Sequence, residues 1–595
     1  MTQDEIAWDL SEMFKKTDDP RIEETMKDLE KRAEEIAIKY KGKINTPDFS
    51  FDNLFELIQT QEEFTADLAE LNQFARLSFA GNLTNSEFRA LQNKAEEFST
   101  KIRKKLAFLD LEISKYVYDN KGVLSAPVLV NYKHELERIC RAYPHKLSEI
   151  EEQLILEKDQ HGVVAWQQLQ AKWLNTRQFE VEVEGELKSL SYGEANGLLG
   201  HPDRATRTSA NKSIYGLLGK EQEVFSSAMA SICGDWVKVS ERRKYDSPMH
   251  QSLIANDVDQ QTIDNLMVAI EENVGIYRRY LKLKAKLLGL PKLSCEDVVA
   301  PLPDSPDMTY SWEQAQEVIL EAYGNFDEDF HSTAKDMFER NHIDASPRFG
   351  KRNGAFCSTW YKGKTSFILQ TFTGALSNVY TLAHELGHAV HGYLVSRSQT
   401  FSNTRYPMVI AEVASIFGEL LVTDLLLEKA KTKEEKKAIL SRVLDGAGMA
   451  TFQVSARVWF EQGMYDTIKE GKMLDGKTIS ELWIGARDRI YGDAVEWFEE
   501  MDWEWTMKPH YYRSNFRFYN YPYVFAQMFV YALYQIYQEE GESFIPKIKE
   551  ILKSGSSKSP KEYGEIMGLD ITQPDFWKLG MKQYERFVDE LEKLV

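Results

Sequence analysis

The segment TLAHELGHAVHGYL contains two histidines four residues apart, His384 and His388, and Glu385 directly follows the first. On an α-helix, residues i and i+4 share a face, so both imidazoles can bind one cation. Glu385 then lies beside the open coordination position, where a carboxylate can take a proton from water. The spacing therefore predicts a hydrolytic metal centre, and zinc is the metal that suits these ligands.

A third ligand is predicted in VIAEVASIFGEL, where Glu412 begins another apolar-periodic stretch after His388. A second helix packed against the first would bring this carboxylate to the metal and complete a two-His, one-Glu site for one zinc ion. Glu419 lies two helical turns further on. We interpret Glu419 either as a carboxylate that orients an imidazole or as an ordinary, partly exposed helical acid.

His391 lies near the same helical face as His388 and could be mistaken for a ligand. A metzincin would continue from His388 with glycine at position 391 and histidine at position 394, whereas this chain has His391 and Leu394 there. We therefore expect His391 to be a hydrogen-bonded neighbour of the metal ligands.

Helical periodicity dominates the elements that must position these residues, above all in residues 1–175. Two segments instead predict β-hairpins: residues 179–190 around Gly185, and residues 355–372 around Lys362 and Gly363. Ser311, with Gln314 three residues later, predicts a capping box that opens a helix. We expect a mainly α fold with a small β-sheet beside the zinc-binding helix.

The chain has 595 residues, more than one hydrophobic core supports, so at least two lobes are expected. We divide it into an amino-terminal helical lobe, residues 1–200, and a catalytic domain, residues 201–595. The net charge of −20 argues against nucleic acid or an anionic membrane as a partner. Four scattered cysteines, no signal-peptide pattern and no long apolar run predict a cytoplasmic protein. The oligomeric state cannot be read from the sequence.

The string HELGHAVH, followed by the EVAS segment that ends in Glu419, resembles the thimet-oligopeptidase-like gluzincins, particularly the oligoendopeptidase F branch. WDLSEMF, YKGKI, NGAFCSTW and HYYRSNFRFYNYPYVFAQ are similar to that branch as well, so the resemblance covers nearly the whole chain. It implies two helical lobes that enclose a deep substrate channel, and cleavage of oligopeptides, not folded proteins.

The same resemblance assigns His384, His388 and Glu412 as the zinc ligands and Glu385 as the catalytic base. It further assigns His510 and Tyr523 as the donors that face the reacting carbonyl group. Relatives place another tyrosine about five residues after that histidine, where this chain has none, so Tyr512 or Tyr519 is the candidate substitute. All of these aromatic residues could also be plain core residues.

The hairpin before the zinc-binding helix is a candidate substrate site that includes Gly354 and Ala355. An exposed strand over residues 354–358 can pair with an extended peptide through main-chain hydrogen bonds. A structural sheet edge is the alternative, and the resemblance favours substrate binding.

Together these features predict a zinc endopeptidase that hydrolyses internal bonds of short oligopeptides. One alternative is a gluzincin aminopeptidase, but its Gly-x-Met-Glu-Asn segment is not found ahead of the zinc motif. The other is a helical peptide-binding protein that retains the motif without turnover.

Overall fold

The computed structural model describes residues 6–303, 306 and 308–595, and in these ranges the chain is mainly helical. The strands form only small sheets there, of two, two and three strands. This confirms the predicted fold class, including the small sheet near the helix that carries His384 and His388. No helix in the described ranges is long and apolar enough to span a bilayer. The substrate channel stays a prediction.

The chain forms two compact units, and each is assembled from segments that are far apart in the sequence. The first unit comprises Met1–Tyr143, Asp307–Lys429 and Ile536–Leu569, and the second comprises Pro144–Pro306, Ala430–Gln535 and Asp570–Val595. The division expected at residue 200 describes two contiguous segments, not these interleaved units, and it stays a prediction.

The first unit contains the predicted metal ligands. Its helices are α1 (Pro20–Tyr40), α2 (Phe51–Gly81), α3 (Ser86–Leu106), α4 (Phe108–Asp119), α5 (Lys133–Ala142), α13 (Trp312–Phe326), α14 (Glu328–Glu339), α15 (Leu376–Ser398), α16 (Met408–Ala411), α17 (Val413–Lys429), α22 (Ile545–Ser554) and α23 (Pro560–Met567). The predicted capping box is confirmed at the start of α13, where Ser311 and Gln314 each bond the other's backbone N–H.

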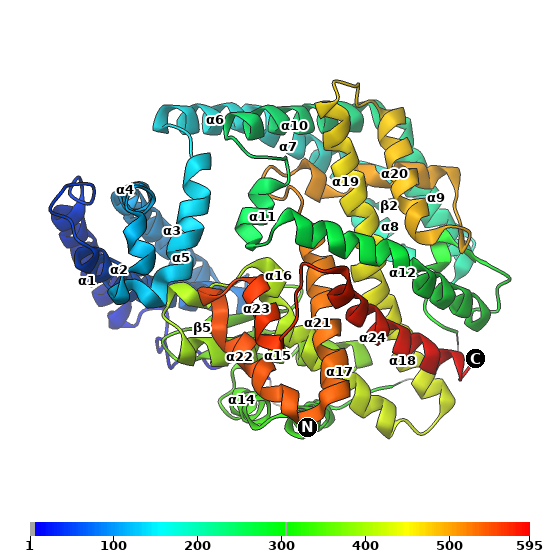
Figure 1. Cartoon of the computed structure of the whole chain (residues 1–595). Coiled ribbons are helices and arrows are strands. Elements are labelled where there is room, and N and C mark those ends of the chain that lie inside the picture. Colours follow the sequence, from blue (N-terminus) through cyan, green and yellow to red (C-terminus); the bar gives the residue numbers. More distant parts are fainter. Residues whose placement is uncertain (1–5, 304–305, 307) are drawn as a thin grey trace. The chain divides into compact units, whose positions relative to one another are not determined.

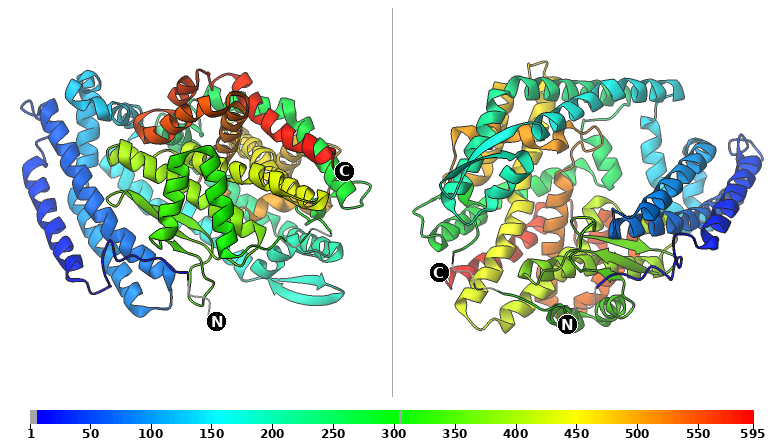
Figure 2. Two further views of the ribbon diagram at one scale, coloured as in Figure 1. Left: turned by 90° about the horizontal axis from the view of Figure 1, so that it is seen from below. Right: turned by 180° about the vertical axis from the view of Figure 1, so that it is seen from behind.

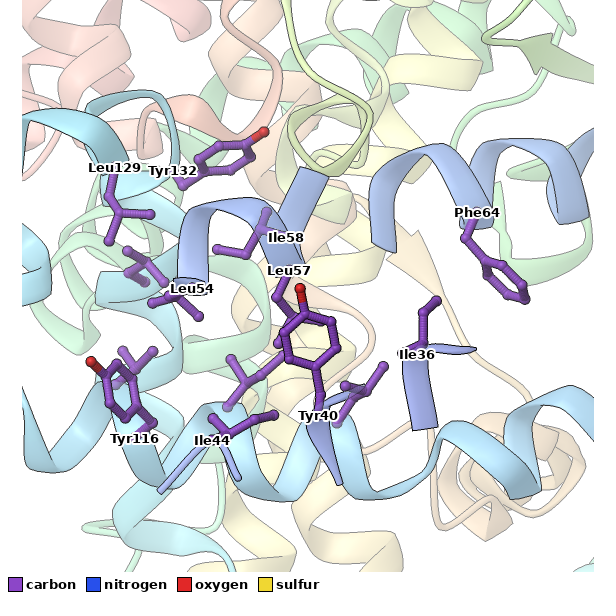
Figure 3. Packing of buried hydrophobic residues seen from close by; sticks show 14 of the residues in the cluster. Ile36, Tyr40, Ile44, Leu54, Leu57, Ile58, Phe64, Tyr116, Leu129 and Tyr132 are labelled. Carbon is purple, nitrogen blue, oxygen red and sulfur yellow. The ribbon is translucent and has the colours of Figure 1, made fainter. Parts of the chain in front are cut away.

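Helices α1 to α4 lie side by side at the blue end of the chain (Figure 1). A cluster of buried side chains joins them, and Figure 3 shows Ile36 and Tyr40 of α1 facing Leu54 and Leu57 of α2. Tyr116 of α4 extends the cluster and donates a hydrogen bond to the carbonyl oxygen of Phe49 at 2.9 Å. The periodic apolar faces of these helices therefore form a core of their own within the first unit.

The first unit also contains a three-stranded sheet in the order β4 (Ile343–Asp344), β6 (Thr365–Leu369), β5 (Phe356–Trp360). Strands β5 and β6 pair antiparallel and form the hairpin that was predicted around Lys362. Every residue of β6 is buried. The turn is fixed to α2, because Lys362 forms ion pairs with Glu70 at 2.7 Å and Asp67 at 3.0 Å. Strand β5 forms one edge of the sheet.

The second unit is also helical. Its helices are α6 (Glu149–His161), α7 (Val163–Asn175), α8 (Tyr192–Gly197), α9 (Arg204–Lys220), α10 (Gln222–Arg242), α11 (His250–Asn256), α12 (Gln260–Leu287), α18 (Lys433–Gly448), α19 (Val454–Lys469), α20 (Gly476–Tyr491) and α24 (Pro574–Glu592), and α21 (Tyr521–Glu540) has residues in both units.

Two small sheets accompany these helices. One pairs β3 (Leu293–Ser294) with β7 (Val495–Glu496) in parallel. The other is the ribbon of β1 (Gln178–Val183) and β2 (Glu186–Ser191), drawn in cyan in Figure 2. Its two-residue turn, Glu184 and Gly185, has positive φ at both positions, the conformation of a type I′ hairpin turn. This confirms the hairpin that the sequence predicted around Gly185.

Candidate metal centre

Helix α15 carries the HExxH segment and packs closely against α17. A methyl group on Gly387 would lie 2.6 Å from the Cα of Ser415 and nearer still to the carbonyl oxygen of Ala414. Only glycine leaves room for such an approach, because real Cβ atoms do not come so near to backbone atoms. The glycine between the two histidines therefore sets the distance between α15 and the start of α17.

A second contact fixes the same helix one turn earlier. The hydroxyl of Tyr323 donates a hydrogen bond to the carbonyl oxygen of Ala383 at 2.6 Å, and both groups are buried. Gly418 of α17 leaves the space that the Tyr323 ring occupies. These contacts hold the backbone directly beside His384, so the first imidazole is carried by a rigid support.

Three donor atoms converge between α15 and α17. The Oε2 atom of Glu412 lies 3.2 Å from Nε2 of His384 and 3.3 Å from Nε2 of His388. Two ligands at about 2.0 Å from a tetrahedral zinc ion are about 3.3 Å apart. The separations therefore match those that zinc would impose, and this trio is the sole candidate cation group of three or more side chains in the described ranges.

Glu419 contacts the other nitrogen of the first imidazole. Its Oε1 atom lies 2.7 Å from Nδ1 of His384, one hydrogen bond away on the side opposite Glu412. Of the two readings that the sequence left open for Glu419, this geometry suits the carboxylate that orients an imidazole.

The carboxylates give the centre a strong preference for positive charge. Burial alone would raise the pKa of Glu412, but hydrogen bonds with His384 and His388 outweigh burial and hold this pKa far below its usual value. Burial alone would lower the pKa of His384, but Glu412 and Glu419 raise it instead. A divalent cation can supply the charge that these groups otherwise draw from protons.

Glu385 is nearly buried, with 7% of its surface exposed. Burial raises the pKa of its carboxyl group, and the neighbouring imidazoles of His384 and His388 oppose that rise. Burial also raises the pKa of Cys357 of β5, and the Glu385 carboxylate adds to that rise. A carboxylate whose pKa is moved toward neutrality is suited to proton transfer.

The hydrogen bonds predicted for His391 are not formed. The ring is completely buried, and neither of its nitrogens has a hydrogen-bond partner among the described residues. It stacks instead on the ring of Tyr406 with the centroids 4.0 Å apart and the planes parallel within 1°. Burial and the nearby His388 lower the pKa of His391 to about 3, so the ring is neutral and acts by packing.

The edge strand is only partly open. Gly354 and Ala355 are exposed but precede β5, and Gly354 has a φ of +89°, so the strand that was expected over residues 354–358 begins only at Phe356. Further along, Gln73 of α2 donates a hydrogen bond to the carbonyl oxygen of Ser358 at 3.1 Å. The part of the expected pairing surface at Ser358 is therefore occupied, and the exposed residues 354 and 355 lie before the strand.

The predicted aromatic residues belong to the second unit, where three of them form a chain of ring contacts. The ring of Tyr519 stacks on His510, with the centroids 5.5 Å apart and the planes 11° from parallel. Its other neighbour is Tyr523, at 5.3 Å in an edge-to-face contact. Tyr523 is 39% exposed, whereas Tyr512 has no exposed surface. Tyr519 is therefore the better candidate for the additional tyrosine.

Charge around His510 favours the neutral imidazole. Burial lowers the pKa of His510, and the cations Lys508, Arg457 and Arg513 lower it further. A neutral imidazole keeps one N–H, which can donate a hydrogen bond.

An HExxH helix joined by a carboxylate from the junction of two following helices, here Glu412 between α16 and α17, is the arrangement of a metal-dependent peptidase. The sequence profile of peptidase family M3 matches residues 198–583, and that of Oligopeptidase F matches residues 120–179. The chain belongs to peptidase family M3, and it is a metallopeptidase, a hydrolase of peptide bonds.

Similar proteins extend over almost the whole chain. Oligopeptidase PepF of Bacillus subtilis is 27% identical over 563 residues, 94% of this chain and 83% of the relative. An oligoendopeptidase F homolog of Lactococcus lactis is 26% identical over 601 residues, 100% of this chain and 98% of the relative.

Solved structures share the fold. A Chlamydophila abortus chain assigned as a peptidase has a TM-score of 0.88 at 22% identity and covers 99% of this chain and 98% of its own. Oligoendopeptidase-F of Enterococcus faecium has a TM-score of 0.69 at 23% identity, with 97% and 99% covered.

Several residues that shape the site were not predicted from the sequence. Gly387, Tyr323 and Gln73 act through contacts with distant segments. Only Gly387 offered a signal, because a glycine inside a helical pattern is unfavourable unless close packing requires it.

Proposed function

We propose that the protein is a zinc-dependent endopeptidase that hydrolyses internal peptide bonds of short oligopeptides. One observation carries the proposal: Glu412 Oε2 is separated from Nε2 of both His384 and His388 by the distance expected around a tetrahedral zinc ion, and the three ligand atoms lie within 4.8 Å of one another. The oligopeptide substrate class is supported by relatives whose names describe oligoendopeptidases.

His384, His388 and Glu412 are the residues that would hold one zinc ion. When bound, zinc polarises a carbonyl group and lowers the pKa of water toward about 7. Glu419 fixes the orientation of the His384 ring through Nδ1, which leaves Nε2 directed at the metal position. Glu412 and Glu419 draw positive charge to this point, which a dication would supply in place of protons.

Glu385 is proposed as the general base. Its carboxylate accepts a proton from the attacking water and later transfers that proton to the leaving amine nitrogen. Burial, which raises the pKa of this group, supports the role, because a carboxylate with a raised pKa is a stronger base and accepts the proton more readily.

His510 and Tyr523 are proposed as hydrogen-bond donors to the oxygen that becomes negative during the reaction. Support comes from the family resemblance, from the neutral state favoured for His510 and from the exposure of Tyr523. Loss of one such donor typically lowers the rate about a hundredfold or more. Tyr519, which stacks on His510, is proposed to contact substrate.

The exposed residues just before β5 are proposed to contact the substrate. Gly354 and Ala355 offer main-chain groups to an extended peptide, and recognition through the main chain depends little on the side chains of the peptide. Binding through the main chain suits a peptidase that accepts many oligopeptides.

The test is cleavage of an internally quenched peptide blocked at both ends, with the zinc content of each protein measured in parallel. We expect wild type to cut the peptide internally, and Glu385→Gln to keep its zinc and lose activity by several orders of magnitude. Glu428→Gln, which alters an exposed carboxylate on α17, is the matched control and should behave as wild type. An intact blocked peptide would point to an aminopeptidase, and a protein without zinc would refute the proposed metal site.

A further inference from the structure

The segment from His510 to Tyr523 has little regular structure before α21 begins at Tyr521. Consecutive tight turns form its middle part: the N–H of Phe516 donates to the carbonyl oxygen of Arg513 at 3.1 Å, and the N–H of Tyr519 donates to that of Phe516 at 3.2 Å. A chain of turns has no helix or sheet ladder to stabilise it, so its conformation depends on side chains from other elements.

Glu461 of α19 supplies such a side chain. Its Oε1 atom accepts a hydrogen bond from the N–H of Phe518 at 2.7 Å, and its Oε2 atom accepts one from Nδ2 of Asn520 at 3.3 Å. The Glu461 side chain is buried, with 3% exposed, so both contacts are shielded from water. A carboxylate that accepts two hydrogen bonds in such surroundings is a strong anchor.

The anchored residue needs support, because Phe518 has a φ of +52°. A bulky side chain in the left-handed region is costly, and the surroundings must maintain it. The Phe518 ring stacks on Tyr465, one turn after Glu461 on α19, with the centroids 5.1 Å apart. Its carbonyl oxygen accepts a hydrogen bond from Ser252 of α11 at 3.4 Å. The N–H of Phe518 itself is bound by Glu461.

The turn determines where the neighbouring aromatic ring lies. Tyr519 follows Phe518 directly and stacks on His510, while its edge contacts Tyr523. A backbone at Phe518 that relaxed to negative φ would rotate the next residue and remove the Tyr519 ring from both neighbours. The hydrogen bond to Glu461 thus controls the mutual placement of the three exposed or half-buried rings.

We propose that Glu461 is a positioning residue for peptide hydrolysis: by binding the N–H of Phe518 and the amide of Asn520, it fixes the turn that holds Tyr519 between His510 and Tyr523. This inference rests on the function proposed above for His510 and Tyr523. Glu461 itself does not touch substrate. Its loss should lower the rate of the chemical step more than the affinity for peptide, since main-chain pairing with the substrate is assigned to other residues.

The experiment compares three variants of the full-length, zinc-loaded enzyme on the blocked quenched peptide. Glu461→Ala removes both acceptors, whereas Glu461→Gln keeps an acceptor for the N–H of Phe518. Val458→Ala, a buried position on the same helix with no hydrogen bond to the segment, controls for general destabilisation of α19. For each variant we would measure kcat, KM, zinc content and Tm.

We expect Glu461→Ala to lower kcat at least tenfold with KM within about threefold of wild type and with full zinc content. Glu461→Gln should restore kcat to within about threefold, and Val458→Ala should retain kcat at a similar loss of Tm. A wild-type kcat in Glu461→Ala, or an equal loss in Val458→Ala, would overturn the proposal. If Glu461→Ala does not fold, Asn520→Ala, which removes one contact, should lower kcat severalfold, and an unchanged kcat would overturn the proposal equally.

The same series separates this inference from the proposed function. If His510→Ala and Tyr523→Phe keep full activity while Glu461→Ala loses it, the proposed donor roles are wrong, whereas Glu461 is still needed for turnover. If all three variants lose activity and Glu461→Gln keeps it, both proposals hold.

Discussion

Gly387 and Ser415 approach each other so closely that a methyl group on Gly387 would lie 2.6 Å from the Cα of Ser415. Gly387 lies between the two histidines that are proposed as ligands, and Ser415 lies one turn after Glu412 and donates a hydrogen bond to its carboxylate at 2.7 Å. The close approach of α15 and α17 therefore also determines how far Glu412 lies from His384 and His388.

Gly387→Ala should push α17 away and separate Glu412 from the imidazoles. Overpacking of this kind costs about 1–3 kcal/mol of stability, and we expect zinc affinity to fall at least tenfold. Chelator competition and thermal unfolding would measure the two effects. Gly446→Ala is the matched control: it lies in helix α18 with nothing within 4 Å of the added methyl group. That variant should be neutral or stabilised by up to about 1 kcal/mol. Unchanged zinc affinity in Gly387→Ala would contradict the role given to this contact.

Glu419 should control how tightly His384 binds the metal. Glu419→Gln keeps the shape of the side chain but removes the negative charge that lies 2.7 Å from Nδ1 of His384. Loss of such a partner typically costs about 10–100-fold in metal affinity or activity. We expect a shift of this size in the zinc dissociation constant, and none in Glu428→Gln, which changes an exposed acid of the same helix. Equal affinities in the two variants would leave Glu419 as an ordinary helical acid.

If Gly354 and Ala355 form main-chain hydrogen bonds with the substrate, the KM for a peptide should depend on its backbone N–H groups. We expect N-methylation of one substrate amide to raise KM about tenfold or more, and methylation of the next amide to have little effect, because successive N–H groups of a strand point to opposite sides. Kinetics on a series of blocked peptides, each methylated at one position, would show the alternation. A uniform effect along the peptide would argue against main-chain pairing at this edge.

Features that depend on neighbours in the chain were predicted from the sequence. The HExxH helix, the turn at Glu184 and Gly185 and the cap at Ser311 each follow from a few adjacent residues. The grouping of Glu412 with the two histidines was also predicted, because the apolar period of each helix shows which face must pack.

Features that depend on distant residues were missed, and the reason is physical. Gln73 donates a hydrogen bond to the carbonyl oxygen of Ser358, which lies 285 residues further along the chain, and no local sequence pattern indicates that contact. His391 was expected to form hydrogen bonds because buried polar groups usually do, but its ring packs on Tyr406 instead. Tyr512 and Tyr519 look alike in sequence, and only tertiary packing buries one and leaves the other within reach of solvent.

The buried carboxyl group of Glu461 should make the stability of the protein depend on pH. Burial raises its pKa from 4.5 to about 7 in the folded protein, against the lowering effect of the hydrogen bonds from Phe518 and Asn520 and of the nearby Arg517. Because the folded pKa is the higher one, folding favours the protonated form. The resulting stabilisation is present below about pH 4.5, declines as the pH rises through about 7, and is lost above pH 8.

The difference between wild type and Glu461→Gln isolates this contribution, because glutamine does not titrate. A raised pKa of this size corresponds to at most about 3 kcal/mol. We expect the free energy of unfolding of wild type to fall relative to that of Glu461→Gln between pH 5 and pH 7. Above pH 8 the difference between the two free energies should stay constant. Unfolding by denaturant at several pH values would measure the difference. Parallel curves from pH 5 upward would show that the carboxyl group keeps an ordinary pKa and that its surroundings are more hydrated than this structure implies.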